Sequence, residues 1–342
     1  MRRHLPQTET LYAQLLELAL AGEADHVGGF ARGSPVSRVV NGQTYLYWQL
    51  RDIGGKQKQV YLGPRDNPRA VVLRDALVAF KARAHDDDLE KLTAAYVASG
   101  GASNQTSHFK VVDALARAGL FRAGAVLVGS HAFVSIGAAL GVTFAAQEAA
   151  TADVDFCRDQ FVSVACDELR RIDVPGVLRA MDPSFLLVPE LDLRTPSTSL
   201  VSQRNKTKVD LLTTAKTPRD TKPRVVAPFG LGAQPLRYMD FLVRHGVQRA
   251  LFIGKTSVLI NVPDAARYAI HKLAISTRRH SSIKALKDVR QADAMLQVLA
   301  EVRPGSIAIA MRAARANHDK GLVRDVLAAS GKLSPASRAA LR

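Results

Sequence analysis

The sequence predicts an α+β protein in which a small mixed sheet lies between an N-terminal helix-and-hairpin region and a helical C-terminal domain. A helical period over residues 8–22 is followed by two β-type runs within 43–64. Short apolar runs typical of strands are then scattered between 124 and 262, with helical patterns among them. From Pro263 onward the pattern is helical. The 342 residues leave room for two or three domains with a substantial core.

The composition is that of a globular protein from a reducing compartment. Hydrophobic residues make up 47%, but charges interrupt every apolar stretch before it reaches the roughly 20 residues of a membrane helix. The basic start MRRHLPQTET has no apolar stretch after it, so no signal peptide is expected. Cys157 and Cys166 lack the spacing of metal ligands and are expected to be small buried hydrophobes. We therefore expect a cytoplasmic location and no membrane partner.

Positive charge is concentrated in the last third of the chain. The net charge is +16, and residues 216–342 hold 23 lysines and arginines against 8 aspartates and glutamates. Such an asymmetry favours a polyanionic partner, such as RNA, DNA or the phosphates of a nucleotide. The alternative is a basic surface without a specific partner.

The N-terminal region, residues 1–103, is predicted to be helical with a β-hairpin. Residues 8–22 carry leucines on one stripe, and Gly22 is expected to end this helix. The run QTYLYWQLRDIGGKQKQVYLGP, residues 43–64, predicts two strands around an IGGK turn. Residues 68–98 predict one long helix or two.

The hairpin carries aromatic side chains on one face. Tyr45, Tyr47 and Gln49 alternate along the first strand, and basic residues stand nearby. Aromatic and basic groups together can stack on bases and hold phosphates. The alternative, which we favour from the sequence alone, is that the aromatic face packs on a neighbouring element.

Linker composition divides the chain. The stretch GGASNQTS, residues 100–107, is rich in small polar residues and glycine and predicts a domain boundary. We expect a core domain over 104–262 and a basic helical C-terminal domain over 263–342.

The core begins with a pattern that suits phosphate binding. The run AVLVGS leads a short strand into Gly129 and Ser130, and a helix follows. A glycine lets the backbone approach a phosphate, and the free N–H groups and dipole of a helix start favour its negative charge. Ser130 adds a hydroxyl donor. Many α/β turns share this pattern, so it is weak evidence alone.

Three carboxylates on two predicted strands strengthen this interpretation. Asp153 and Asp155 share one face of TADVDF, while Val154 and Phe156 point to the core. Asp210 lies in a second strand, KVDLLTT. Like charges so close are costly to ionise without a cation between them. Carboxylate pairs suit Mg²⁺, and two such ions can clamp a displacement at phosphorus.

Together these motifs resemble the nucleotidyltransferase superfamily, whose fold is shared by DNA polymerase β, aminoglycoside nucleotidyltransferases and CCA-adding enzymes. The matching residues are Gly129-Ser130, Asp153-x-Asp155 and Asp210. The hairpin, VLVGSHAF, TADVDF and ARYAIHKLAISTRR also resemble a bacterial family of uncharacterised nucleotidyltransferase-fold proteins, over about residues 40–300. One departure is that 22 residues separate Ser130 from Asp153, about twice the usual spacing of the superfamily.

The resemblance implies Mg²⁺-dependent transfer of a nucleoside monophosphate from an NTP to an acceptor, which is RNA, tRNA or a protein hydroxyl. Gly129 and Ser130 would bind the triphosphate, while Asp153, Asp155 and Asp210 would hold two Mg²⁺ ions and carry catalysis. Toxins of toxin–antitoxin and phage-defence systems use this fold, which implies a role as a toxin or defence protein with an antitoxin partner. The alternative is a catalytically inactive nucleic-acid-binding protein on the same fold.

Two residues of the C-terminal region match positions beside the site in related toxins. Lys272 would bind the triphosphate as a point charge, and Asp288 would orient it. The alternative for both is an ion pair between helices.

Overall fold

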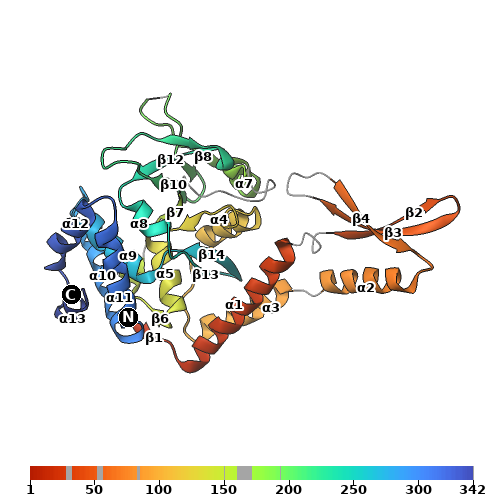
Figure 1. Ribbon diagram of the computed structural model, residues 1–342, viewed down its shortest axis with the longest axis horizontal. Coiled ribbons are helices and arrows are strands. Elements are labelled where there is room, and N and C mark those ends of the chain that lie inside the picture. Colours follow the sequence, from red (N-terminus) through yellow and green to blue (C-terminus); the bar gives the residue numbers. More distant parts are fainter. Residues whose placement is uncertain are drawn as a thin grey trace.

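The helices and strands form a central body with an arm on one side (Figure 1). The computed structural model describes residues 1–27, 33–51, 57–82, 85–149, 151–159, 172–192 and 194–341. Mixed sheets and a helical C-terminal region give the α+β class that the sequence predicts. Cys166 lies outside the described residues, and Cys157 is a buried free thiol, as expected.

A seven-stranded mixed sheet forms the centre of the body. Its strands are β5 (Val126–Leu127), β7 (Asp153–Arg158), β8 (Phe185–Leu187), β9 (Ser199–Ser202), β10 (Lys208–Thr214), β11 (Arg224–Val226) and β12 (Leu231–Leu236). β10 lies in the middle, parallel to β7 on one side and to β12 on the other, and β5 forms an edge beside β7. The sequence predicts the first five of these strands. It misses β11 and β12, since the glycine and proline of LGAQPL argue against a strand.

The register of β7 and β10 places acidic side chains opposite one another. Asp155 pairs with Asp210 and Asp153 pairs with Lys208, while Val154 pairs with Val209. Because side chains alternate between the two faces of a strand, both valines enter the core and the charged residues share the other face.

Two helices flank β5 in the chain. α4 (Thr106–Arg117) precedes β5, and α5 (Gly129–Ala139) follows it directly. The extra length between Ser130 and Asp153 consists of the rest of α5, the short strand β6 (Val142–Thr143) and the short helix α6 (Ala146–Ala149). Further short elements are β1 (Arg2–Arg3), which pairs with β6, α7 (Val174–Met181), η3 (Ala227–Phe229) and α8 (Met239–Val243).

A second small sheet joins the N-terminal helices to the body. β13 (Gln248–Ile253) and β14 (Ser257–Val262) form a hairpin around Gly-Lys-Thr. α1 (Pro6–Val27) and α3 (His85–Ala98) pack against it through a cluster that includes Tyr12, Leu15 and Tyr96. The prediction that Gly22 ends the first helix is wrong, because α1 continues to Val27. A helical glycine costs only about 1 kcal/mol, which the packing of α1 offsets.

The arm consists of a three-stranded antiparallel sheet and one helix, and it extends to the right in Figure 1. These elements are β2 (Ser34–Val40), β3 (Gln43–Arg51), β4 (Gln57–Pro64) and α2 (Pro68–Ala82). β3 and β4 are the predicted hairpin, whose IGGK turn lies outside the described residues, and β2 was not predicted. Residues 68–98 form two helices, α2 and α3.

The tyrosines of the arm lie on the face of its sheet opposite to α2. Leu46 and Trp48 are buried on the α2 side of β3, where Gly63 of the paired strand meets Ala70. Tyr45 and Tyr47 therefore point to the other face, where they are half-buried and contact Tyr61 of β4 and Arg38 of β2. Packing of these tyrosines on a further element stays a prediction.

Five helices complete the body, as the pattern after Pro263 predicts. They are α9 (Ala265–Ser276), α10 (Ser282–Val302), α11 (Pro304–Ala316), α12 (Gly321–Ser330) and α13 (Pro335–Ala340). Asp264 and Ser281 cap α9 and α10 through their side chains. One hydrophobic core runs from Phe109 in α4 to Leu341, so sheet and C-terminal helices share it. Among the helices described, none has the length and apolar character to cross a membrane.

Candidate active site

The three predicted carboxylates lie on one face of the central sheet. Asp155 and Asp210 are direct neighbours across β7 and β10, and Asp153 is two residues before Asp155 on the same strand. Lys208 is the cross-strand neighbour of Asp153. The structure therefore brings together in space residues that are more than fifty positions apart in the chain.

The glycine turn lies directly against this acidic face. Gly129 opens α5 with a positive φ of 66°, and a Cβ at this position would collide with Oδ2 of Asp155. The backbone N–H of Val128 also donates to the carbonyl of Asp155, at 2.9 Å. The start of α5, with its free N–H groups, is thus held beside the Asp155 carboxylate, which is where a phosphate would bridge helix and cation.

Ser130 has a partner in the C-terminal helices. Its Oγ accepts a hydrogen bond from Nε2 of Gln291, at 3.2 Å, and Ser130 is buried. Tyr268 on α9 donates to the carbonyl of Gly129, at 3.0 Å. Both contacts attach the glycine turn to α9 and α10 and so position it from two sides.

Gly129→Ala is expected to lower the activity by about a hundredfold and the free energy of unfolding by about 2 kcal/mol. The methyl group would meet Asp155, and the left-handed backbone adds strain for any residue with a Cβ. Initial rates and urea unfolding measure the two effects. Gly331→Ala is the control, because a Cβ there meets nothing within 4 Å. Equal activity of Gly129→Ala and the wild type would contradict the assignment of the glycine turn to the active site.

The surroundings of Asp155 disfavour its ionised form, although Lys272 and Lys208 act in the opposite direction. Burial raises the pKa of Asp155 to about 6, and the carboxylates of Asp210 and Asp153 add to this shift. Ionisation of Asp155 therefore carries a free-energy cost at this position of the fold.

Asp210 has two polar partners. Ser199 on β9 donates its hydroxyl to Oδ1 at 2.5 Å, and Nζ of Lys208 lies 2.8 Å from the same oxygen. Burial alone would lower the pKa of Lys208, but the hydrogen bond and charge of Asp210, with the other two carboxylates, raise it. Lys208 therefore acts as an internal counter-ion of the acidic face. Lys208 lies two residues before Asp210 and therefore on the same face of the strand. Our sequence analysis missed this relation.

The carboxylates of this face can be compared with the ligands that Mg²⁺ takes. In the part of the chain that the structure describes, no three His, Cys, Asp or Glu side chains converge closely enough to cage a metal ion. Mg²⁺ does not need such a cage, because it takes one or two carboxylates and completes its shell with water and substrate phosphate. The opposed pair Asp155 and Asp210, with the raised pKa of Asp155, provides that kind of site.

A cavity of about 300 Å³ opens beside Asp155 and Gly129, between the sheet and α9. Its wall is partly apolar and partly basic. The basic side chains are Arg237, Lys272, Arg278 and Arg279, and the apolar ones are Leu212, Leu236, Met239, Leu242 and Ile275. A small-molecule site of this kind combines an apolar surface with a few convergent polar groups. Here four of the polar side chains are cationic, and Asp155, Tyr268 and His271 line the cavity with them.

Lys272 and Asp288 form a buried ion pair between α9 and α10. Nζ of Lys272 lies 2.7 Å from Oδ1 of Asp288, and Nε of Arg279 lies 2.6 Å from its other oxygen. Burial would raise the pKa of Asp288, but the charges of Lys272 and Arg279 outweigh it and lower this pKa. The inter-helix ion pair that the sequence left open therefore exists, and Lys272 also lines the cavity.

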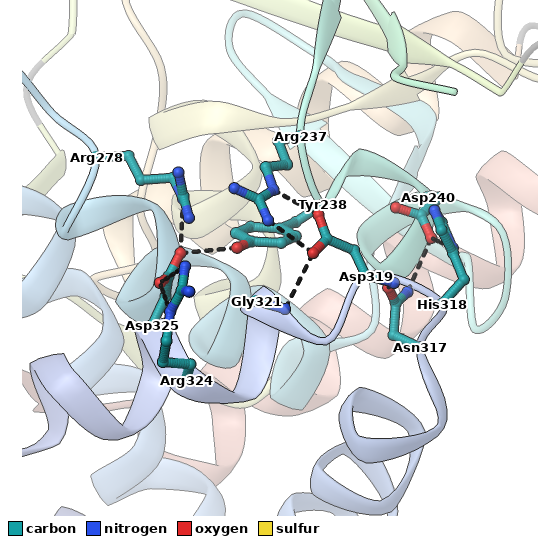
Figure 2. A network of polar contacts seen from close by, with 10 residues as sticks. All are labelled: Arg237, Tyr238, Asp240, Arg278, Asn317, His318, Asp319, Gly321, Arg324 and Asp325. Atoms are coloured by element: carbon teal, nitrogen blue, oxygen red, sulfur yellow. Dashed lines mark hydrogen bonds and ion pairs between the residues drawn. The ribbon is translucent and has the colours of Figure 1, made fainter. Parts of the chain in front are cut away.

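A polar network holds two further arginines of the cavity wall (Figure 2). The ring of Tyr238 lies between the guanidinium groups of Arg237 and Arg278, at 4.8 and 5.5 Å from its centroid. Arg278 and the Tyr238 hydroxyl both donate to Asp325 of α12, at 2.6 and 2.7 Å.

Asp319 completes this arrangement by accepting hydrogen bonds from Nε and Nη2 of Arg237. The backbone of Tyr238 is left-handed, with φ 66°, which for a bulky residue is sustained only by such surroundings. Sequence analysis missed the network, because Asp319 and Asp325 lie more than 80 positions from Arg237.

Comparisons with known proteins give one family. The model of a family described as nucleotidyltransferase matches residues 106–316, which include all the predicted site residues. No curated protein matches the chain. A solved structure, that of an antigenic nucleotidyltransferase-like protein from Paracoccidioides brasiliensis, is similar at 15% identity and a TM-score of 0.38, over 70% of this chain and 94% of that one.

Proposed function

The chain belongs to this nucleotidyltransferase family, and from this premise we propose that it transfers a nucleoside monophosphate from an NTP to a hydroxyl group. The acceptor oxygen forms a bond to the α-phosphorus, the bond to the β-phosphate oxygen breaks, and pyrophosphate leaves. The observation that carries the proposal is the direct opposition of Asp155 and Asp210 beside the start of α5 and a cation-lined cavity.

The residues of the chain have distinct roles in this proposal. The backbone at Gly129 and the hydroxyl of Ser130 bind the triphosphate at the start of α5. Lys272 neutralises its charge from the cavity wall, and Asp288 holds Lys272 in place at 2.7 Å. Asp210 accepts the proton of the attacking hydroxyl, with Ser199 fixing its carboxylate.

Asp153, Asp155 and Asp210 would hold two Mg²⁺ ions in the active complex. When bound, these ions supply positive charge to the phosphate oxygens and the attacking oxygen. Lys208 would then give up its contact with Asp210 or remain as a further cation on its outer side.

The acceptor proposed is RNA or tRNA, or a protein hydroxyl, in the cytoplasm. The positive charge of residues 216–342 favours a polyanion. A role as a toxin or defence protein, with an antitoxin partner, extends the proposal by resemblance and needs growth assays with the Asp210→Asn variant as its control.

The test uses NTPs labelled at the α-phosphate, Mg²⁺, total RNA and cell protein. We expect label in RNA or protein, release of pyrophosphate, and loss of both in Asp210→Asn. Asp192→Asn, which alters an exposed loop carboxylate, is the matched control and should keep full activity. Labelled products without a labelled acceptor would indicate a hydrolase instead. RNA binding without transfer, the same in both variants, would indicate the inactive nucleic-acid-binding alternative.

A further inference from the structure

The outer face of the arm sheet carries a row of aromatic and amide side chains. Tyr47 pairs with Tyr61 and Gln49 pairs with Gln59 across β3 and β4, and Arg38 of β2 pairs with Tyr45. These residues share the face opposite to buried Leu46 and Trp48. We call this surface the tyrosine face. It consists of Arg38, Tyr45, Tyr47, Gln49, Gln59 and Tyr61.

The side chains of the tyrosine face are arranged as a platform. The ring centroids of Tyr47 and Tyr61 are 5.4 Å apart, and those of Tyr45 and Tyr61 are 6.1 Å apart. The guanidinium of Arg38 lies over the Tyr47 ring at 5.9 Å. Beside the rings, Nε2 of Gln59 donates to Oε1 of Gln49 at 3.0 Å.

Folding of the arm does not account for the tyrosine face. The core of the arm is on the other side, where Leu46, Trp48 and Ala70 are buried. Among the described elements, β2, β3 and β4 make their extensive contacts only with one another and with α2. Tyr61 is 54% exposed. Tyr45 and Tyr47 beside it are half-buried. Rings grouped on one accessible sheet face, rather than scattered, indicate a binding surface.

The charge of the arm complements a nucleic acid. Residues 34–82 hold eight lysines and arginines against three aspartates. Flat rings on neighbouring strands stack on unpaired bases, cations hold the phosphates, and side-chain amides bond to base edges and to the 2′-hydroxyl that distinguishes RNA. An acidic peptide would use the cations but not the rings, and a membrane would need an apolar face without amides.

We infer that the tyrosine face binds single-stranded RNA. The arm would thus recruit the RNA that accepts the nucleotide. Binding of RNA to the arm does not depend on the proposed function, whereas the role of this RNA as the acceptor rests on it. Figure 1 shows the arm on the far side of α1 and α3 from the C-terminal helices, so it binds RNA at a distance from the acidic face.

The test is binding of the full-length protein to a fluorescein-labelled 16-nucleotide RNA, by anisotropy and without NTP. Tyr47→Ala/Tyr61→Ala should weaken binding about tenfold or more, since each stacked base loses its ring. Tyr47→Phe/Tyr61→Phe keeps the rings and should bind within about twofold of the wild type. Circular dichroism melting of all variants establishes that the arm remains folded.

Charge is tested by a matched pair of arginine variants. Arg38→Ala should weaken binding and reduce its salt dependence, whereas Arg204→Ala, in an exposed turn of the body, should not. A wild-type protein that fails to bind RNA, an alanine double variant that binds normally, or a DNA of the same sequence that binds as tightly as the RNA would overturn the inference.

Binding and transfer can fail independently in this experiment. Asp210→Asn removes the proposed chemistry and leaves the tyrosine face intact, so it should bind the RNA as the wild type does. If transfer is absent in every protein but RNA binding follows the tyrosine variants, the inference stands and the proposed function fails. If the tyrosine variants bind normally while transfer depends on Asp210, the reverse holds.

Discussion

Asp155→Asn is expected to reduce nucleotidyl transfer about a thousandfold or more while making the protein more stable in the absence of divalent cations. The carboxylate is proposed to hold Mg²⁺, whose charge stabilises the transition state by several kcal/mol. The same carboxylate is costly to the empty fold, because it is buried near Asp210 and Asp153. Asparagine removes the charge and keeps the shape, so function and stability should change in opposite directions.

The stability gain has a defined pH dependence. The pKa of Asp155 rises from 3.8 to about 6 on folding, so between these values the folded protein binds more protons than the unfolded chain. Stability therefore falls as the pH rises from about 4 to about 6 and stays lower above that range. The gain from asparagine should be about 2 kcal/mol at pH 7.5, allowing for water in the cavity, and should vanish near pH 4.

Urea unfolding at pH 4 and pH 7.5, with EDTA and then with Mg²⁺, measures this prediction. Mg²⁺ should stabilise the wild type at pH 7.5 and have little effect on Asp155→Asn. Asp192→Asn is again the control, with no expected change in stability. A variant that keeps a tenth of the transfer activity, or a stability gain that is the same at both pH values, would contradict the role of Asp155.

The second large effect concerns the ion pair of α9 and α10. Asp288→Ala should lower the free energy of unfolding by about 3–5 kcal/mol, because it leaves the ammonium of Lys272 buried without its partner. Lys272 is 6% exposed and Asp288 3%, so the lost contact lies in a largely desolvated place. Urea unfolding provides the measurement. Asp113→Ala, which breaks the exposed pair with Arg117, should cost only about 0.5 kcal/mol.

A double variant separates the structural role of Lys272 from binding of the triphosphate. Lys272→Met/Asp288→Leu replaces the pair by apolar side chains and should recover most of the stability lost in Asp288→Ala. If Lys272 binds the triphosphate, this stable protein should still have a KM for NTP at least about tenfold above that of the wild type. An unchanged KM would show that the pair is structural only.

The sequence predicts which residues of a core strand face inward, since neighbours along the chain determine this alternation. The alternation in TADVDF and KVDLLTT assigned Val154 to the core and the aspartates to the other face, and the structure has that arrangement. The glycine before a helix was likewise recognised at Gly129. Weak strands escaped detection: β12 contains glycine and proline, and it forms because the edge of β10 is there to pair with.

The amino-acid sequence alone therefore predicts the strands and helices that carry the acids, the glycine turn and the basic C-terminal region. Which side chains meet depends on the fold: Lys208 and Ser199 on Asp210, Arg279 on Asp288, and the arginines held around Tyr238 (Figure 2). The fold also determines that the tyrosines of the arm face away from α2. The physical reason is that periodicity assigns a residue to a face, whereas its partner depends on the register and packing of elements far apart in the chain.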